Sequence, residues 1–148
     1  KAQQILGEKY GVAADVWSVT SYKELYMDGL ATERWNLLHP AAKQRVPYVT
    51  QCLKDAPGVL VAATDYLKAL PNMVAKWMPR RLAALGTDGF GRSEGRASLR
   101  DFFENDARFI VLNTLRELHL DGKIQASVVQ KAIKELEINA EKPNPVTV

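Results

Sequence analysis

A short apolar run that opens into three closely spaced glycines is the feature that most constrains this sequence. Leu82–Leu85 is apolar throughout, and the segment Gly86-Thr-Asp-Gly-Phe-Gly-Arg-Ser93 follows it directly. Glycine tolerates positive φ and a close approach of the backbone, so three glycines within six positions predict a tightly folded loop. A buried strand that opens into such a loop is the usual place for a site in an open α/β sheet. We expect the rest of the chain to form the layers that hold this strand and orient this loop.

Two further segments have the composition of strands. Val59–Ala63 is continuously apolar, which is the pattern of a strand covered on both faces. Asp15–Val19 is rich in β-branched and aromatic residues, which favour strands. Together with Leu82–Leu85 they predict three neighbouring parallel strands. The side chains that we expect to be largely buried in this sheet are Trp17, Val61 and Ala84.

Helical patterns surround these strands. Ser21 and Glu24 form a predicted capping box for a helix over Tyr22–Leu30, and Asp106 is placed to cap a long helix over Ala107–Leu120. The other predicted helices are Lys1–Tyr10 with Gly11 as its stop, Thr32–Leu38, one from Pro47 to Pro57, Tyr66–Met78 capped by Asp65 and kinked at Pro71, Ala97–Phe103 and Ser127–Leu136. Helices between buried strands predict an α/β fold, one domain over residues 1–148 with helices on both faces of a mostly parallel sheet.

The composition is that of a globular domain and gives no sign of a nucleic-acid or membrane partner. The apolar share of 47% and the charged share of 25% are ordinary for a globular domain. The net charge of +3 is spread along the sequence and no apolar run approaches the roughly 20 residues of a membrane helix, so we expect neither a nucleic-acid nor a membrane partner. The single cysteine, Cys52, is compatible with a reducing compartment, and we expect a packed thiol in a cytoplasmic protein.

The start of the sequence predicts a piece of a longer polypeptide. Lys1 is not a methionine, and Lys1–Leu6 already has the pattern of the middle of a helix with nothing before it that could act as a cap.

The glycine-rich loop differs at one position from the phosphate-loop pattern G-x-x-x-x-G-K-[ST]. Arg92 stands where that pattern has the lysine that reaches the phosphates, and Gly95 interrupts the segment that should be the first turn of a helix. A stand-alone phosphate- or nucleotide-binding domain that uses Gly86–Ser93 is therefore the alternative interpretation, and a structural loop is the preferred one.

The preferred interpretation gives the loop residues separate roles in a structural clamp. Gly86, Gly89 and Gly91 would permit the turn, and Asp88 would accept backbone N–H bonds inside it. Phe90 would pack into the domain or against a neighbouring one. Arg92, followed by Ser93, would pair with a carboxylate or a carbonyl across that contact.

Other candidates for chemistry are few. His39 and His119 fall at predicted helix ends, without a Cys, Asp or second His at the spacing of a metal site. Asp88-Gly89 with Asn113 downstream is similar to the thiamine-diphosphate pattern, but the pattern's first glycine is absent and Asn113 falls inside a predicted helix. We therefore expect no catalytic, cofactor-binding or metal-binding residue in this sequence.

Six stretches are familiar in their order and spacing. They are Asp15-Val-Trp-Ser-Val-Thr-Ser21, Glu33-Arg-Trp-Asn-Leu-Leu-His-Pro40, Arg45-Val-Pro-Tyr48, Ala63-Thr-Asp-Tyr66, Leu85-Gly-Thr-Asp-Gly-Phe-Gly-Arg-Ser93 and Ile138-Asn-Ala-Glu-Lys-Pro-Asn-Pro145. Over nearly the whole chain, the sequence resembles the C-terminal domain of the homodimeric, bacterial-type pyruvate dehydrogenases. A transketolase or another 2-oxo acid dehydrogenase stays open as a relative, and the quoted stretches favour pyruvate dehydrogenase.

The resemblance carries implications for fold and function. It implies a transketolase C-terminal-like, three-layer α/β/α fold with a mostly parallel sheet of about five strands, here without its first strand. The whole protein would decarboxylate pyruvate on thiamine diphosphate, with magnesium, and reductively acetylate a lipoyl group. Both cofactors would be held by the preceding domains across a homodimer, so this piece alone would bind none and be inactive. The implied partners are those preceding domains, a second protomer and the dihydrolipoyl acetyltransferase component, and the domain itself would be structural.

Overall fold

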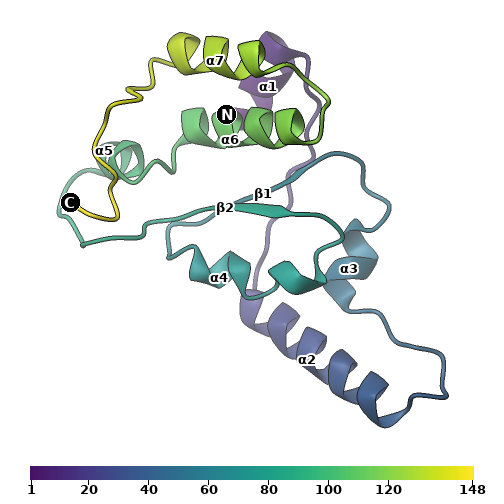
Figure 1. The fold of residues 1–148 in the computed structure, drawn as a ribbon. Coiled ribbons are helices and arrows are strands. Elements are labelled where there is room, and N and C mark those ends of the chain that lie inside the picture. The colour runs from purple at the N-terminus through teal and green to yellow at the C-terminus, as the bar shows by residue number, and fades with distance from the viewer.

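A pair of parallel strands lies between two layers of helices in the computed structural model, which describes all residues from 1 to 148 (Figure 1). β1 (Leu60–Ala63) pairs with β2 (Leu82–Leu85), with Leu60 opposite Leu82 and Ala63 opposite Leu85. The order of secondary-structure elements therefore confirms the α/β class, but the parallel sheet at its centre has two strands, where the resemblance implies about five.

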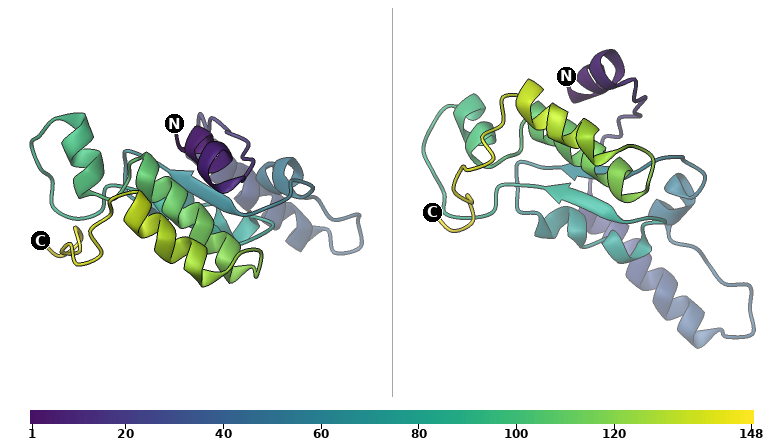
Figure 2. Two further views of the ribbon diagram at one scale, coloured as in Figure 1. Left: turned by 90° about the horizontal axis from the view of Figure 1, so that it is seen from above. Right: turned by 45° about the horizontal axis from the view of Figure 1, so that its top comes forward.

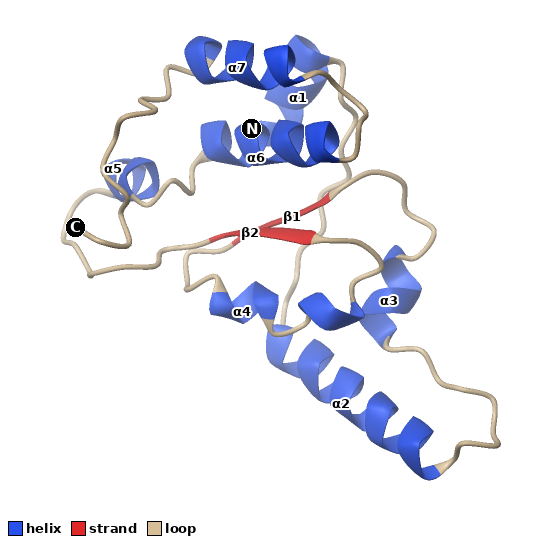
Figure 3. Cartoon of the chain, viewed as in Figure 1, coloured by secondary structure: helices blue, strands red, loops and turns tan.

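Helices cover both faces of this sheet (Figure 3). One layer contains α1 (Ala2–Tyr10), α6 (Ala107–Leu120) and α7 (Ala126–Glu135). The other contains α2 (Tyr22–Leu38), α3 (Tyr48–Leu53), α4 (Ala69–Asn72) and the 3-10 helix η1 (Ala75–Trp77). α5 (Arg96–Phe102) lies beyond the carboxyl ends of the strands, close to the C-terminus (Figure 2).

The two helical layers hold separate apolar cores. On one side, buried side chains of α1, α6 and α7 meet in a cluster of Leu6, Val111, Leu115, Ala132 and Leu136. On the other side, Val49 of α3, Val74 and Trp77 form a second cluster, against which residues of α2 pack. In the strands between them, Leu85 is buried and Ala63 is exposed. Val61 and Ala84 are half-buried, so those two residues are less enclosed than the sequence predicts.

The predicted strand over Asp15–Val19 is wrong. Residues 11–20 form an extended connection that crosses from one helical layer to the other (Figure 1), and no strand pairing includes them. Val16 and Trp17 are 76% and 60% exposed, so Trp17 is not buried either. β-Branched and aromatic residues favour a strand only where a neighbouring strand and a covering layer give them something to pack on, and this segment has neither.

Several helix boundaries follow local signals. The Asp106 side chain accepts hydrogen bonds from the backbone N–H groups of Arg108 and Phe109, and α6 begins at Ala107 as predicted. Ser21 accepts from the N–H of Glu24 at the start of α2. That helix is one continuous element, where the sequence predicts two, because no residue near Leu30 and Thr32 interrupts helical hydrogen bonding.

The predicted helix over Tyr66–Met78 is shorter and divided. α4 begins only at Ala69, and Pro71 therefore lies in its first turn, where a missing N–H does no harm. Asp65 does not cap this helix, since α4 has no side-chain cap. No helix of the structure combines the length and the apolar character that crossing a bilayer requires.

Candidate functional site

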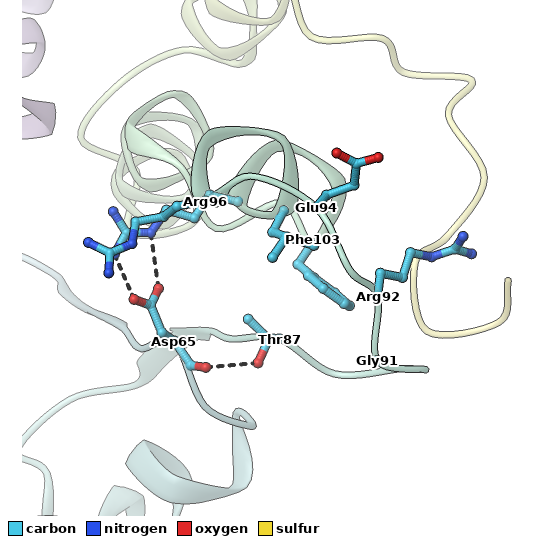
Figure 4. A pocket seen from close by; sticks show the side chains of 9 residues that line it. Asp65, Thr87, Gly91, Arg92, Glu94, Arg96 and Phe103 are labelled. Atoms are coloured by element: carbon cyan, nitrogen blue, oxygen red, sulfur yellow. Dashed lines mark hydrogen bonds and ion pairs between the residues drawn. The ribbon is translucent and has the colours of Figure 1, made fainter.

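The carboxyl ends of β1 and β2 form one wall of a hollow of about 400 Å³ (Figure 4). Asp65 follows β1 and Thr87 follows β2 on this wall. The opposite wall is α5 with Phe103 just after it, and the glycine loop joins the two walls. Open α/β sheets bind their ligands at this edge, so the hollow is the candidate site.

Hydrogen bonds continue past the ends of the strands and fix the floor of the hollow. Thr64 N–H donates to Leu85 O at 3.1 Å, and Thr87 N–H donates to Tyr66 O at 2.9 Å. The Thr87 hydroxyl also donates to Asp65 O at 3.1 Å. These bonds hold the two strand exits side by side, so the Asp65 carboxylate faces α5 from a fixed backbone.

The Asp65 carboxylate forms a two-pronged ion pair with Arg100 of α5. Arg100 Nε donates to Asp65 Oδ1 at 3.0 Å, and Arg100 Nη2 donates to Asp65 Oδ2 at 2.7 Å. The hydrogen bond from Arg100 holds the pKa of the Asp65 carboxyl below its usual value, and the charges of Arg100 and Arg96 add to this effect. The pair thus connects the end of β1 to α5 across the hollow.

Two of the three loop glycines are required by their surroundings. A Cβ atom on Gly86 would lie 2.5 Å from Tyr66 O and 2.7 Å from Lys68 N. Gly89 has a φ of 115°, and a Cβ there would collide with Pro145 O. Nothing lies within 4 Å of a Cβ atom added to Gly91, and its φ is not positive, so the surroundings do not require glycine at that position.

The remaining loop residues depart in part from the predicted clamp. Asp88 accepts a backbone N–H bond, but from Lys68 outside the loop, at 3.2 Å. Phe90 is 74% exposed and so is not packed into this domain. Arg92 pairs with no carboxylate or carbonyl of the chain; its guanidinium lies 4.3 Å from the centre of the Phe102 ring.

The loop also lacks the geometry of a phosphate loop. Such a loop leads directly into the first turn of a helix, whose N–H groups cradle the phosphates. Here Ser93 is exposed, Gly95 caps the helix, and α5 begins only at Arg96. Gly86–Ser93 therefore does not form a phosphate loop of the G-x-x-x-x-G-K-[ST] kind, which the nucleotide-binding alternative requires.

The other candidates that the sequence singles out lie apart from this hollow. His39 Nδ1 lies 2.8 Å from Trp35 O, and its ring stacks on that indole. His119 Nδ1 lies 3.1 Å from Ile124 O at the end of α6. Cys52 is half-buried on α3. No group of three or more His, Cys, Asp or Glu side chains is placed to hold a metal ion.

Comparison with known proteins identifies the family. Residues 1–106 match the transketolase-like TK C-terminal domain. The chain belongs to the transketolase-like C-terminal domain family. The matched residues include both strands, the glycine loop and α5, and they end just before α6.

Relatives of this transketolase-like C-terminal domain are much longer proteins. The chain is 46% identical over 147 residues to the pyruvate dehydrogenase E1 component of Pseudomonas aeruginosa, which is 99% of the chain and 17% of that relative. It is 48% identical over 146 residues to the pyruvate dehydrogenase E1 component of Escherichia coli, covering 98% of the chain and 16% of the relative. The protein of the same name from Mycolicibacterium smegmatis is 41% identical over 139 residues, 94% of the chain and 15% of the relative.

Asp88 and Asn113, the two residues that are similar to the thiamine-diphosphate pattern, are not arranged as in a thiamine-diphosphate and magnesium site. Asn113 lies inside α6 and its side-chain amide donates to Phe109 O at 2.9 Å. Asp88 is engaged with the backbone N–H of Lys68. The two residues that are similar to the thiamine-diphosphate pattern are therefore each bonded to separate backbone groups.

Three lining residues of the hollow are not among the sequence's candidates. Asp65 is interpreted there as a helix cap, and Arg96 and Arg100 are not singled out. One signal could have indicated them: Arg96 and Arg100 are four residues apart, the spacing of one helix face. That spacing, placed after a strand–loop unit, indicates two guanidinium groups at the carboxyl edge of the sheet.

Proposed function

We propose that this chain is the C-terminal domain of a homodimeric, bacterial-type pyruvate dehydrogenase. The observation that carries this proposal is the identity of 46% over 147 residues, 99% of the chain, with a pyruvate dehydrogenase E1 component. The complete protein would decarboxylate pyruvate on thiamine diphosphate with magnesium and reductively acetylate a lipoyl group. It would act in the cytoplasm together with the dihydrolipoyl acetyltransferase component.

Within that enzyme we assign this domain a structural role. The chain spans 16% to 17% of the length of the two relatives first compared, so most of their residues lie outside the region described. The thiamine diphosphate and magnesium would be bound by preceding domains and across the dimer, as the resemblance implies. The bonds of Asp88 and Asn113 to separate backbone groups of this chain support that assignment.

Exposed apolar side chains at the carboxyl end of the sheet support the structural role. Tyr66 and Leu67, directly after β1, are 72% and 52% exposed, and Phe90 in the glycine loop is 74% exposed. The bond between Thr87 N–H and Tyr66 O holds these two segments next to each other. A shallow hollow beside them, of about 330 Å³, is lined only by apolar residues of the segment 66–73. Apolar patches of this kind mark contacts with other protein surfaces, here the preceding domains or the second protomer.

Calorimetric titration with thiamine diphosphate and magnesium tests the division of labour. The complete protein should bind the cofactor and turn over pyruvate, whereas the 148-residue chain should do neither. Circular dichroism of the shorter chain before the titration establishes that it is folded. Micromolar binding to the folded 148-residue chain, about 8 kcal/mol, would contradict the structural role.

A further inference from the structure

We propose that the hollow at the carboxyl end of the sheet is a binding site for a small oxyanion, a phosphate or carboxylate group, with Arg96 as its main contact and Arg92 on the opposite side. This inference does not rest on the proposed function, because it uses only the side chains that line the hollow.

The lining of the hollow carries an uncompensated positive charge on the side of α5. The Asp65 carboxylate faces α5 from the strand wall, and both of its oxygens are occupied by the fork of Arg100. Arg96 lies close enough to add to the lowering of the pKa of Asp65, yet it forms no hydrogen bond or ion pair of its own within the chain. Two guanidinium groups thus face one carboxylate, and the Arg96 fork is available to a second anion.

Arg92 lies on the other side of the opening, at its outer rim. Figure 4 shows Arg92 and Arg96 on opposite sides of Phe103, and both the Glu94 carboxylate and the Arg92 guanidinium point away from Asp65 and Thr87. The Arg92 guanidinium makes no ion pair; its contact is the ring of Phe102. Because stacking leaves the edge of a guanidinium free, Arg92 can still donate to an anion.

The backbone of the loop adds N–H donors that no backbone carbonyl of the chain already occupies. The N–H groups of Gly91 and Arg92 donate no hydrogen bond to another backbone carbonyl of the chain. Both residues line the hollow, and neither Gly91 nor its neighbours are held in a helix or strand. An oxyanion that bridges Arg96 and the loop would therefore find unpaired donors on two sides.

Size and apolar lining indicate the kind of ligand. A hollow of about 400 Å³ is larger than a free phosphate ion requires, and Leu99 and Phe103 give it an apolar part. The ligand class is therefore a small organic acid or a phosphorylated small molecule that has a short apolar portion beside its oxyanion. The donors that the hollow offers to such a ligand are guanidinium groups and backbone N–H groups.

Protection of individual arginines from phenylglyoxal tests the site in the complete protein. The reagent modifies accessible guanidinium groups, and peptide mass spectrometry reports each arginine separately, so binding elsewhere in the protein is not counted. The probes are inorganic phosphate and acetate at constant ionic strength, with chloride as the reference. We expect one or both to slow the modification of Arg96 several-fold and that of Arg92 to a smaller extent, in a saturable manner. Arg34, an exposed arginine on α2, should react at an unchanged rate.

Variants separate a site from general screening of charge. Arg96→Gln should abolish the protection of Arg92, whereas Arg34→Gln, which removes the same charge elsewhere, should leave it intact. Protection by phosphate alone or by acetate alone assigns the oxyanion class, and either result supports the site. Modification of Arg96 that is insensitive to both probes, or that falls no more than the modification of Arg34, would overturn the proposal.

Discussion

The two ends of the parallel strand pair each carry an arginine–carboxylate ion pair, in opposite surroundings. At the amino end, Arg81 precedes β2 and its Nε donates to Glu117 Oε2 of α6 at 2.5 Å. Glu117 is only 2% exposed, and its other oxygen accepts from Arg116 at 2.7 Å. At the carboxyl end, the side chains of Asp65 and Arg100 are 54% and 42% exposed and line a hollow.

The difference shows that burial decides how much an arginine–carboxylate ion pair contributes to stability. A buried carboxylate costs several kcal/mol of desolvation unless it stays paired, so the pair at the amino end is a fixed part of the structure. An exposed pair contributes little to stability because water solvates either partner well. The pair at the carboxyl end can therefore form part of a binding site. It holds Arg100 on Asp65, while Arg96 stays unpaired.

Removing the partner of the buried carboxylate should have the largest effect. Arg81→Ala leaves Glu117 Oε2 without its hydrogen bond, and we expect the free energy of unfolding to fall by about 3 kcal/mol, as measured by urea denaturation. In the double variant Arg81→Ala/Glu117→Gln the loss should be smaller, because the buried charge that has lost one of its two arginine partners is gone. A loss below about 1 kcal/mol in the single variant would mean that Glu117 is solvated as readily as Asp65.

The glycines of the loop give the next largest effect, again at the carboxyl end. Gly86→Ala places a Cβ 2.5 Å from Tyr66 O, a backbone atom that the Thr87 N–H holds in place. We expect a loss of about 1–3 kcal/mol in the free energy of unfolding. Gly91→Ala is the matched control, since nothing lies within 4 Å of its added Cβ, and thermal denaturation should show no loss. Equal losses for the two variants would disprove the close approach at Gly86.

The elements that the sequence predicts well are those whose signal is local. β2 and α6 have the predicted bounds: a run of four apolar residues marks β2, and a capping aspartate marks the start of α6. Asp15–Val19 fails because strand formation needs a neighbouring strand, which composition does not provide. The site is missed for the same reason: the pairing of Asp65 with Arg100 joins residues 35 positions apart, and only the fold brings them together.

The exposed ion pair should show a small effect that depends on pH. A hydrogen bond from Arg100 lowers the pKa of the Asp65 carboxyl in the folded state, so the pair stabilises the protein above the pKa of the unfolded carboxyl, about 3.9. Asp65→Asn should therefore cost about 0.2–1 kcal/mol at neutral pH, and the cost should disappear as the pH falls through the lowered pKa. Urea denaturation of both proteins between about pH 7 and pH 3 measures this difference. A cost that stays constant to the lowest pH would show that ionisation of Asp65 is not its source.

We expect the smallest effect on stability from a substitution in the exposed apolar surface at the carboxyl end of the strands. Phe90 is 74% exposed, so Phe90→Ala removes little buried area and should change the free energy of unfolding of this chain by less than about 0.5 kcal/mol. The same substitution in the complete protein should weaken association between domains or protomers, since truncating a central aromatic of an interface typically costs more than about 1 kcal/mol. Analytical ultracentrifugation and urea denaturation of the complete protein measure that loss. Leu120→Ala is the control, because Leu120 is 50% exposed at the end of α6, away from the glycine loop. Equal stability and equal association of the complete protein with Phe90→Ala and with Leu120→Ala would show that the apolar carboxyl end is not a contact surface. Of the two ends of the strand pair, only the amino end, with its buried ion pair, would then have a structural role.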